Sequence, residues 1–196
     1  MKFQAAVENW VEHLLSHEFK ERVLEEDPTM LKHVPILAEI NRHGFITNNS
    51  QAGRKNGKQD WDLWERAYLN GFMLQSEAVS FIKEMALHTD KVAQVLHPTT
   101  DQATLDLTSA LNVPLTLEKN KEKTETHMPN TVSISQWDRW RKECHIDKTE
   151  KIVFVVCYDL KWNRSAVGAK GLFKEVLKIL KKIEDKPKNK TLKKNN

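Results

Sequence analysis

The segment KIVFVVCY, residues 151–158, constrains the fold of this chain more than any other segment. It is apolar at nearly every position, which is typical of a central strand that is buried on both faces. Such a strand needs neighbouring strands and helices to cover it. Helical and strand patterns are interleaved along the chain, so we expect an α/β or α+β fold. We predict a single domain, with N-terminal helices followed by a mixed β-sheet flanked by helices.

Two helices are expected before the sheet. Apolar residues spaced three and four positions apart predict a first helix over residues 4–24. A second helix should begin at Asp27, as its N-cap, and Pro28, as its first helical residue. It should be kinked at Pro35 and should end at Gly44.

Three further helices are expected later in the chain. Ser76 can cap the first of them, whose buried face is predicted to hold Val79, Ile82, Met85 and Ala86. A capping box at Ser135 predicts a short helix through Cys144. The spacing of Trp137 and Trp140 in it favours core packing over a nucleic-acid surface. The last helix should run over residues 171–184.

The remaining strands are short and interrupted. Residues 45–47 and 64–74 are predicted strands, although Gly71 weakens the second. Residues 113–117 should form another strand, 118–128 an exposed charged loop, and 131–135 the return strand of a hairpin. Residues 53–60 are expected to form a polar loop.

Two polar loops follow predicted strands. The stretch GFITNNSQAG, residues 44–53, places Asn48 to Gly53 after the first strand, and residues 159–171 follow the apolar strand. Ligands of open sheets lie beyond the carboxyl ends of the strands. If the two strands are parallel and adjacent, both loops face one cavity. The candidate ligand-binding residues are Thr47, Ser50, Gln51, Arg66, Tyr68, Asn70, Asp159, Trp162, Asn163 and Arg164.

The chemistry of these side chains points to a small anionic or nucleotide-like ligand. Arg66 and Arg164 carry forked donors suited to phosphate or carboxylate, and Trp162 or Tyr68 could stack on a base or sugar. No phosphate-loop or dinucleotide motif is present. The sequence assigns no catalytic residue and no cofactor, so an enzyme and a simple binding protein both fit. The alternative is that the polar residues are ordinary turn formers that carry no ligand.

Cysteine and histidine chemistry is not expected. Cys157 lies in the apolar strand and should be an inert, buried thiol. Only His13 and His17 form an i, i+4 pair and no HExxH occurs, so we expect no metal site. Cys144 and Cys157 are too few for a disulfide framework, which favours a reducing compartment, the cytoplasm or nucleus.

The net charge of +4 is concentrated at the C-terminal end. Residues 178–196 hold eight lysines and two acidic residues, while the rest of the chain holds 23 basic and 25 acidic residues. We therefore expect a globular domain over 1–184 and a basic, disordered tail over 185–196. The second functional hypothesis is a non-enzymatic adaptor that binds nucleic acid or protein through this tail. Such binding should fall steeply with salt and be lost on truncation after Glu184. No apolar run is long enough to span a bilayer, so no membrane association is expected.

Two segments also carry a family resemblance. GFITNNSQAG and ERAYLNGFM resemble the paired motifs GF-x-T-x-x-SQ-x-G and RAY-x-x-GFM of uncharacterised proteins of large DNA viruses and bacteria. The resemblance covers about thirty residues and implies that the two segments belong together. It implies no activity. The matching residues are Gly44, Phe45, Thr47, Ser50, Gln51, Gly53, Arg66, Ala67, Tyr68, Gly71, Phe72 and Met73.

Overall fold

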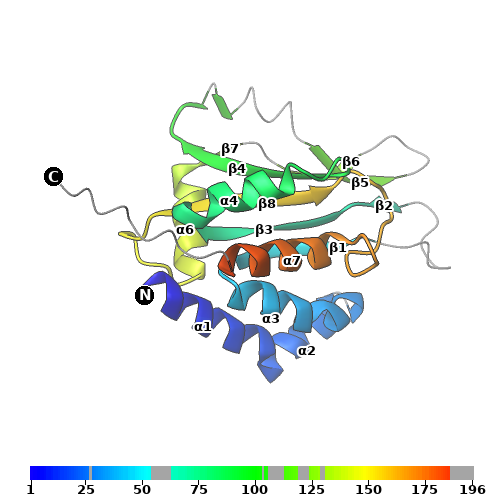
Figure 1. Ribbon diagram of the computed structural model, residues 1–196, viewed down its shortest axis with the longest axis horizontal. Helices are drawn as coiled ribbons and strands as arrows, with labels where there is room; N and C mark the ends of the chain where they lie inside the picture. Colours follow the sequence, from blue (N-terminus) through cyan, green and yellow to red (C-terminus); the bar gives the residue numbers. More distant parts are fainter. Residues whose placement is uncertain are drawn as a thin grey trace.

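The protein is an α+β domain, seen here in a computed structural model (Figure 1). The structure describes residues 1–26, 28–53, 63–102, 104–105, 113–118, 124–128 and 131–185. Its larger sheet consists, in spatial order, of β1 (Ile46–Ala52), β3 (Ala67–Leu74), β8 (Ile152–Asp159), β4 (Lys91–Thr99) and β7 (Thr131–Ser133). A smaller sheet consists of β2 (Leu63–Glu65), β5 (Val113–Glu118) and β6 (Thr124–Met128). The helices are α1 (Phe3–Leu15), α2 (His17–Glu26), the 3-10 helix η1 (Pro28–His33), α3 (Val34–Arg42), α4 (Gln75–Met85), α6 (Ile134–Glu143) and α7 (Leu172–Glu184).

The predicted central strand is confirmed. β8 is third of the five strands and pairs antiparallel with β3 and with β4. Side chains from Phe154 to Asp159 are all buried. β7 pairs parallel with β4, which makes the sheet mixed as expected.

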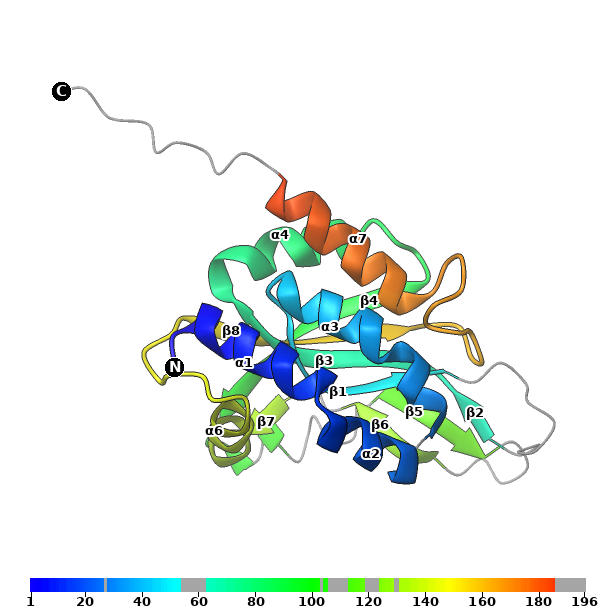
Figure 2. The same ribbon diagram turned by 90° about the horizontal axis from the view of Figure 1, so that it is seen from below.

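Helices cover the two faces of the larger sheet unequally. α3, α4 and α7 supply one core, in which Phe45, Phe81 and Phe173 are fully buried. α3 and α7 lie side by side in both views (Figures 1 and 2). The opposite core joins the start of α1 to α6, so the half-buried side of α6 and the first turns of α1 close that face at one end of the sheet.

Aromatic rings dominate this second core. Phe72 and Phe154 meet edge to face with centroids 4.9 Å apart, and Trp140 stacks on Phe154 at 4.7 Å. Trp137 contacts Phe72 at 5.2 Å. The prediction that these two tryptophans pack in the core is confirmed.

The first two predicted helices are each divided. Ser16 has extended backbone angles, and its hydroxyl accepts a hydrogen bond from the Phe19 amide, so α2 starts anew instead of continuing α1. Pro28 opens η1, and Pro35 lies in the first turn of α3, where a missing N–H is tolerated. Pro35 therefore begins a helix and does not kink one. Gly44 has φ +86° and ends α3 as predicted, while Asp27 lies outside the described residues.

The predicted end of the first strand at Thr47 is wrong. β1 continues to Ala52, so residues 48–52 form an edge strand and not a loop. A bulge between Thr47 and Asn49 interrupts its pairing with β3. Gly71 lies opposite this bulge, where an added Cβ would come 2.0 Å from the Ile46 carbonyl oxygen. Of the loop predicted at 53–60, residues 54–60 lie outside the described residues.

Other strand predictions need smaller corrections. The strand predicted over 64–74 breaks at Arg66 and contributes β2 and β3 to different sheets. The strand predicted at 113–117 is confirmed as β5, and it pairs with β6, which lies inside the predicted loop 118–128. Residues 131–133 pair with β4 and not with β5, so no such hairpin forms.

Two helices begin at different residues from those predicted. α6 begins after Ser133, whose hydroxyl accepts from the Gln136 amide, and not after Ser135. α4 begins directly after β3 without a side-chain cap at its N-terminus, so its buried stripe is Ala78, Phe81 and Met85, and Val79 is exposed. α7 is confirmed within one residue.

Burial determines the protonation state of the two cysteine thiols. Cys144 and Cys157 are free and buried. Burial raises the pKa of Cys144 to about 12, and it raises that of Cys157 as well, so both remain protonated thiols at neutral pH.

None of the described helices combines the length and apolar character that crossing a bilayer requires. The basic tail beyond residue 185 lies outside the described residues.

Candidate functional site

The strand directions bring the two predicted ligand regions to one edge of the sheet. β1 is antiparallel to β3 and β3 is antiparallel to β8, so β1 and β8 are parallel although β3 separates them. The two strands therefore end at the same edge. The chain after β8 returns to β1 there, because the Ala166 amide donates to the Ala52 carbonyl at 2.7 Å. Gly53 has φ +65°, and a Cβ there would come 2.5 Å from the Arg164 carbonyl oxygen.

Strand register places polar side chains on one face near that edge. Gln51 is opposite Tyr68, and Tyr68 is opposite Tyr158, which gives one row across three strands. Asn49 and Asn70 form the next row on the same face. Arg66 precedes β3 at the end of these rows. We call the set the Arg66 cluster: Asn49, Gln51, Arg66, Tyr68, Asn70, Tyr158 and Trp162.

Hydrogen bonding within the Arg66 cluster is incomplete. Gln51 Nε2, Arg66 Nε and Asn70 Oδ1 are buried and have no hydrogen-bond partner among the described residues. Buried polar atoms in folded proteins are normally paired, because an unpaired one costs about 1–3 kcal/mol. Three such atoms on one sheet face therefore need a reason.

Arg66 is the cation of this cluster. Its guanidinium lies over the Trp162 ring, 4.2 Å from the ring centroid, and makes no ion pair with any carboxylate that the structure describes. Burial lowers the pKa of Arg66, while Tyr158 and Asp159 act in the opposite direction. An arginine has so high a pKa that it stays charged even so.

The tyrosines line the same face in neutral form. Tyr68 and Tyr158 are 7% and 6% exposed. Burial raises the pKa of both hydroxyls, and Asn49 hydrogen-bonds the Tyr68 hydroxyl. Both rings therefore present an apolar surface with a neutral hydroxyl at neutral pH.

Asn163 fixes the loop that carries Trp162. Its amide donates to the Glu65 carbonyl at 2.7 Å, and its side-chain oxygen accepts from the Glu65 amide at 3.0 Å. Asn163 has φ 53°, a left-handed conformation that asparagine adopts more readily than most residues. These two bonds tie the loop to the residue before Arg66, so Asn163 positions the stack.

Asp159 and Arg164 form a separate ion-pair group. Arg164 binds Asp159, which is fully buried, and also binds Asp90 at 2.5 Å. The Arg164 hydrogen bond is the main cause that lowers the pKa of Asp90 to about 2. Arg164 is thus occupied by two carboxylates and stabilises the loop instead of offering a free guanidinium.

Thr47 and Ser50 point away from the Arg66 cluster. Asn41 accepts from the Thr47 amide at 2.8 Å and donates to its hydroxyl at 2.9 Å, so Thr47 is held against α3. Ser50 pairs with Leu69, on the face opposite to Gln51. Of the ten predicted residues, the cluster contains Gln51, Arg66, Tyr68, Asn70 and Trp162. The sequence analysis missed Asn49 and Tyr158. Tyr158 and Phe154 are an even number of positions apart along β8, so both side chains lie on the same face of the sheet.

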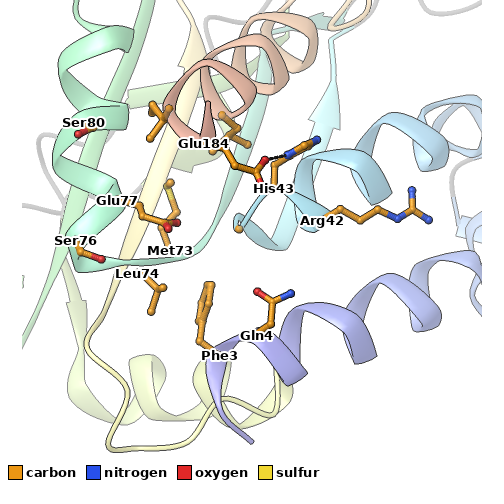
Figure 3. A pocket seen from close by; sticks show the side chains of 13 residues that line it. Phe3, Gln4, Arg42, His43, Met73, Leu74, Ser76, Glu77, Ser80 and Glu184 are labelled. Atoms are coloured by element: carbon orange, nitrogen blue, oxygen red, sulfur yellow. Dashed lines mark hydrogen bonds and ion pairs between the residues drawn. The ribbon is translucent and has the colours of Figure 1, made fainter. Parts of the chain in front are cut away.

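Elsewhere in the described part of the domain, two cavities lie between helices. One, of ≈ 490 Å³, lies between α1, α3, α4 and α7, and its wall includes Phe3, Leu74, Glu77 and the ion pair of His43 with Glu184, 2.5 Å apart (Figure 3). The other, also ≈ 490 Å³, lies between α1, α2, α3 and the outer edge of β1. Prediction anticipated neither, although Thr47 and Ser50 line the second. Among the described residues, no group of three or more His, Cys, Asp or Glu side chains could hold a metal ion.

The comparison with protein families identifies the chain. A family model described as "Domain of unknown function (DUF6919)" matches residues 3–182. The chain belongs to this family. The match runs from the first residue of α1 almost to the end of α7, so the DUF6919 unit is the whole helix and sheet assembly. A search of curated proteins gave no match.

Proposed function

We propose that this DUF6919 protein binds a small anionic, nucleotide-like ligand at the Arg66 cluster. One observation carries the proposal: three buried polar atoms, on Gln51, Arg66 and Asn70, lack partners on a single sheet face. A ligand that supplies partners for them removes an unfavourable contribution already present in the free protein.

Charge supports an anionic ligand. Arg66 is half-buried and has no carboxylate partner among the described side chains, while Asp159, the carboxylate that acts to raise its pKa, is already bound by Arg164. A guanidinium that is stacked on a ring keeps its donors in a fixed plane, which suits phosphate or carboxylate oxygens. The amide groups of Gln51 and Asn70 can both donate and accept, so they suit the neutral polar edge of the same ligand.

The proposed function is ligand binding, and no reaction is assigned to this site. In the part of the chain that the structure describes, the Arg66 cluster contains no carboxylate, imidazole or thiol that would act as a general base or nucleophile. Its two tyrosines have raised pKa values and remain neutral at pH 7.

Calorimetric titration of the full-length protein tests the proposal. AMP, ATP, pyrophosphate and ribose 5-phosphate are the probes, with Arg66→Ala, Arg66→Lys and the surface control Arg139→Ala as variants. Loss of a charged hydrogen-bonding group costs about 1.5–3 kcal/mol, so Arg66→Ala should weaken binding by about 10- to 150-fold. Arg66→Lys should recover part of the affinity, and Arg139→Ala, 65% exposed on α6, should have none of this effect. Equal affinity of Arg66→Ala and the unchanged protein would refute the proposal.

The salt dependence of binding, measured in the same titrations, distinguishes the adaptor hypothesis from binding at the Arg66 cluster. Binding through the basic tail should require oligonucleotides, weaken steeply with salt, and disappear on truncation after Glu184. Binding at the Arg66 cluster should survive that truncation. Salt-sensitive oligonucleotide binding that is indifferent to Arg66→Ala would assign the function to the tail.

We also propose a reducing compartment, the cytoplasm or nucleus, for this protein. Cys144 and Cys157 are both free and buried in the sheet cores. Fractionation of cells that express a tagged chain checks this, and recovery from an oxidising compartment would contradict it.

A further inference from the structure

The second cavity, which we call the helical cavity, differs in kind from the Arg66 cluster. It lies between α1, α2, α3 and the outer edge of β1, and its volume of ≈ 490 Å³ is within the range of small-molecule sites. Its wall includes Trp10, His13 and Phe19 from the helices and Asn48 to Ser50 from β1.

Helix α2 covers this cavity with side chains that are at most half-buried. The structure describes all of its residues, and none of them is buried. Phe19 and Val23 are half-buried and line the cavity. A surface helix normally owes its stability to an apolar stripe packed on the core. Phe19 and Val23 of α2 instead border the cavity, where a ligand would complete their packing.

Aromatic rings and a guanidinium group line the helical side of the cavity. The His13 ring lies between Trp10, at 5.3 Å and 38°, and Phe19, at 5.2 Å and 68°. The Arg22 guanidinium covers Phe19 at 5.2 Å from the ring centroid. Rings and guanidinium planes of this kind bind other flat rings by stacking.

The opposite wall is polar and belongs to a sheet edge. The outer backbone groups of β1 are bonded at its two ends, Thr47 N–H to Asn41 and Ala52 C=O to Ala166. Residues 48–50 between them line the cavity, and the Ser50 amide is bonded to Asn49 Oδ1 at 2.8 Å. Trp10 Nε1, on the helical side, is buried and has no hydrogen-bond partner in the described part of the chain. A ligand here would meet both donors and acceptors at its rim.

The charges of the wall do not favour an anion. Arg22 is its one arginine, and Glu26 and Glu143 carry the opposite charge. Burial, with Arg22 as the next cause, lowers the pKa of His13, so its ring is neutral at pH 7. The ligand suited to this wall is therefore flat, polar at its rim and uncharged.

We propose that the helical cavity binds an uncharged planar heteroaromatic ring, such as the base of a nucleoside, between the Trp10–His13–Phe19 wall and residues 48–50 of β1. This site is independent of the Arg66 cluster, because the two share only Asn49. Binding would complete the packing of α2 on the domain.

Titration of the full-length protein with adenosine, cytidine and inosine tests this proposal. Phe19→Leu keeps an apolar side chain but removes the ring, so it should weaken binding by about fivefold or more while the unfolding temperature stays near that of the unchanged protein. Trp10→Phe should weaken it less, because a smaller ring remains. Arg66→Ala, which removes the proposed anion contact, should leave nucleoside affinity unchanged.

Three results would overturn the proposal. They are the absence of nucleoside binding up to the solubility limit, equal nucleoside affinity of Phe19→Leu and the unchanged protein, and loss of nucleoside binding in Arg66→Ala. The last result would move the nucleoside to the Arg66 cluster. Failure of pyrophosphate and ribose 5-phosphate, which carry no base, to bind, with nucleoside binding retained, would refute the proposed function and leave the helical cavity site intact.

Discussion

Replacement of Asn70 by leucine should make the free protein more stable. Asn70 lies on β3, next to the central strand, and its Oδ1 is buried without a partner among the described residues. An unpaired buried polar atom costs about 1–3 kcal/mol, and leucine has a similar volume without that cost. With some loss to imperfect packing, Asn70→Leu should raise the free energy of unfolding by about 1 kcal/mol. That corresponds to a rise of about 2–4 °C in Tm for a domain of this size.

Asn41 offers a matched control in the same domain. It is also a buried asparagine, but its amide donates to Leu37 O at 2.7 Å and to Thr47 Oγ1 at 2.9 Å, and it accepts from the Thr47 amide at 2.8 Å. Asn41→Leu removes all three bonds and leaves the buried amide and hydroxyl of Thr47 without their Asn41 partners. It should lower the free energy of unfolding by about 2–5 kcal/mol.

Urea denaturation followed by tryptophan fluorescence, with calorimetry for Tm, measures both variants. The reasoning requires opposite signs for Asn70→Leu and Asn41→Leu. A loss of more than about 1 kcal/mol in Asn70→Leu would show that the Asn70 amide is paired, and it would remove the main support for a ligand at the Arg66 cluster. If the reasoning holds, the stabilised variant should also bind the anionic ligand more weakly.

Three further predictions concern the fold. Gly71→Ala should lower the free energy of unfolding by about 3 kcal/mol or more, because its Cβ would come 2.0 Å from the Ile46 carbonyl oxygen; a loss below 1 kcal/mol in urea denaturation would contradict the described register. Ser133→Ala should cost about 1 kcal/mol through loss of the α6 cap, and the neighbouring Ser135→Ala should cost clearly less; equal costs in the same assay would refute the cap assignment. Because Arg164 lowers the pKa of Asp90 to about 2 from its ordinary 3.8, the stabilisation from this pair is complete above pH 3.8 and is lost as the pH falls through 2. Asp90→Asn should therefore flatten the acid limb of Tm against pH, and an unchanged limb would show that other carboxylates set it.

Apolar patterning predicted the parts of the fold that are buried. The continuous run at 151–158 identified the central strand, and the spacing of Leu172, Val176 and Ile179 identified α7. The same approach missed most of β1, because an edge strand of Asn, Ser and Gln has no apolar alternation to detect. Its pairing with β3, from Thr47 to Ala52, is a tertiary interaction that overrides the turn preference of those residues.

Only part of the candidate site was predicted, because the edge strand β1 was mistaken for a loop. Gln51 lies on the face of Tyr68 and Asn70, and Ser50 lies on the other face, because side chains alternate along a strand. A loop has no such alternation, so Ser50 and Gln51 were predicted to act together. The binding of Arg164 by Asp90 joins residues 74 positions apart, and no local pattern indicates it.

The most direct test of the proposed ligand site is the NMR signal of the Arg66 Nε–H group in the full-length protein. This atom is buried and unpartnered among the described residues, so a ligand that completes the cluster must change its surroundings. Arg66→Lys assigns the signal by its disappearance, and the Arg164 signal serves as the internal reference because its guanidinium is already bound to Asp90 and Asp159. Titration with AMP or pyrophosphate should shift the Arg66 signal and leave that of Arg164 in place. An Arg66 signal that stays in place while pyrophosphate, which carries no base, binds would contradict a ligand site at the Arg66 cluster.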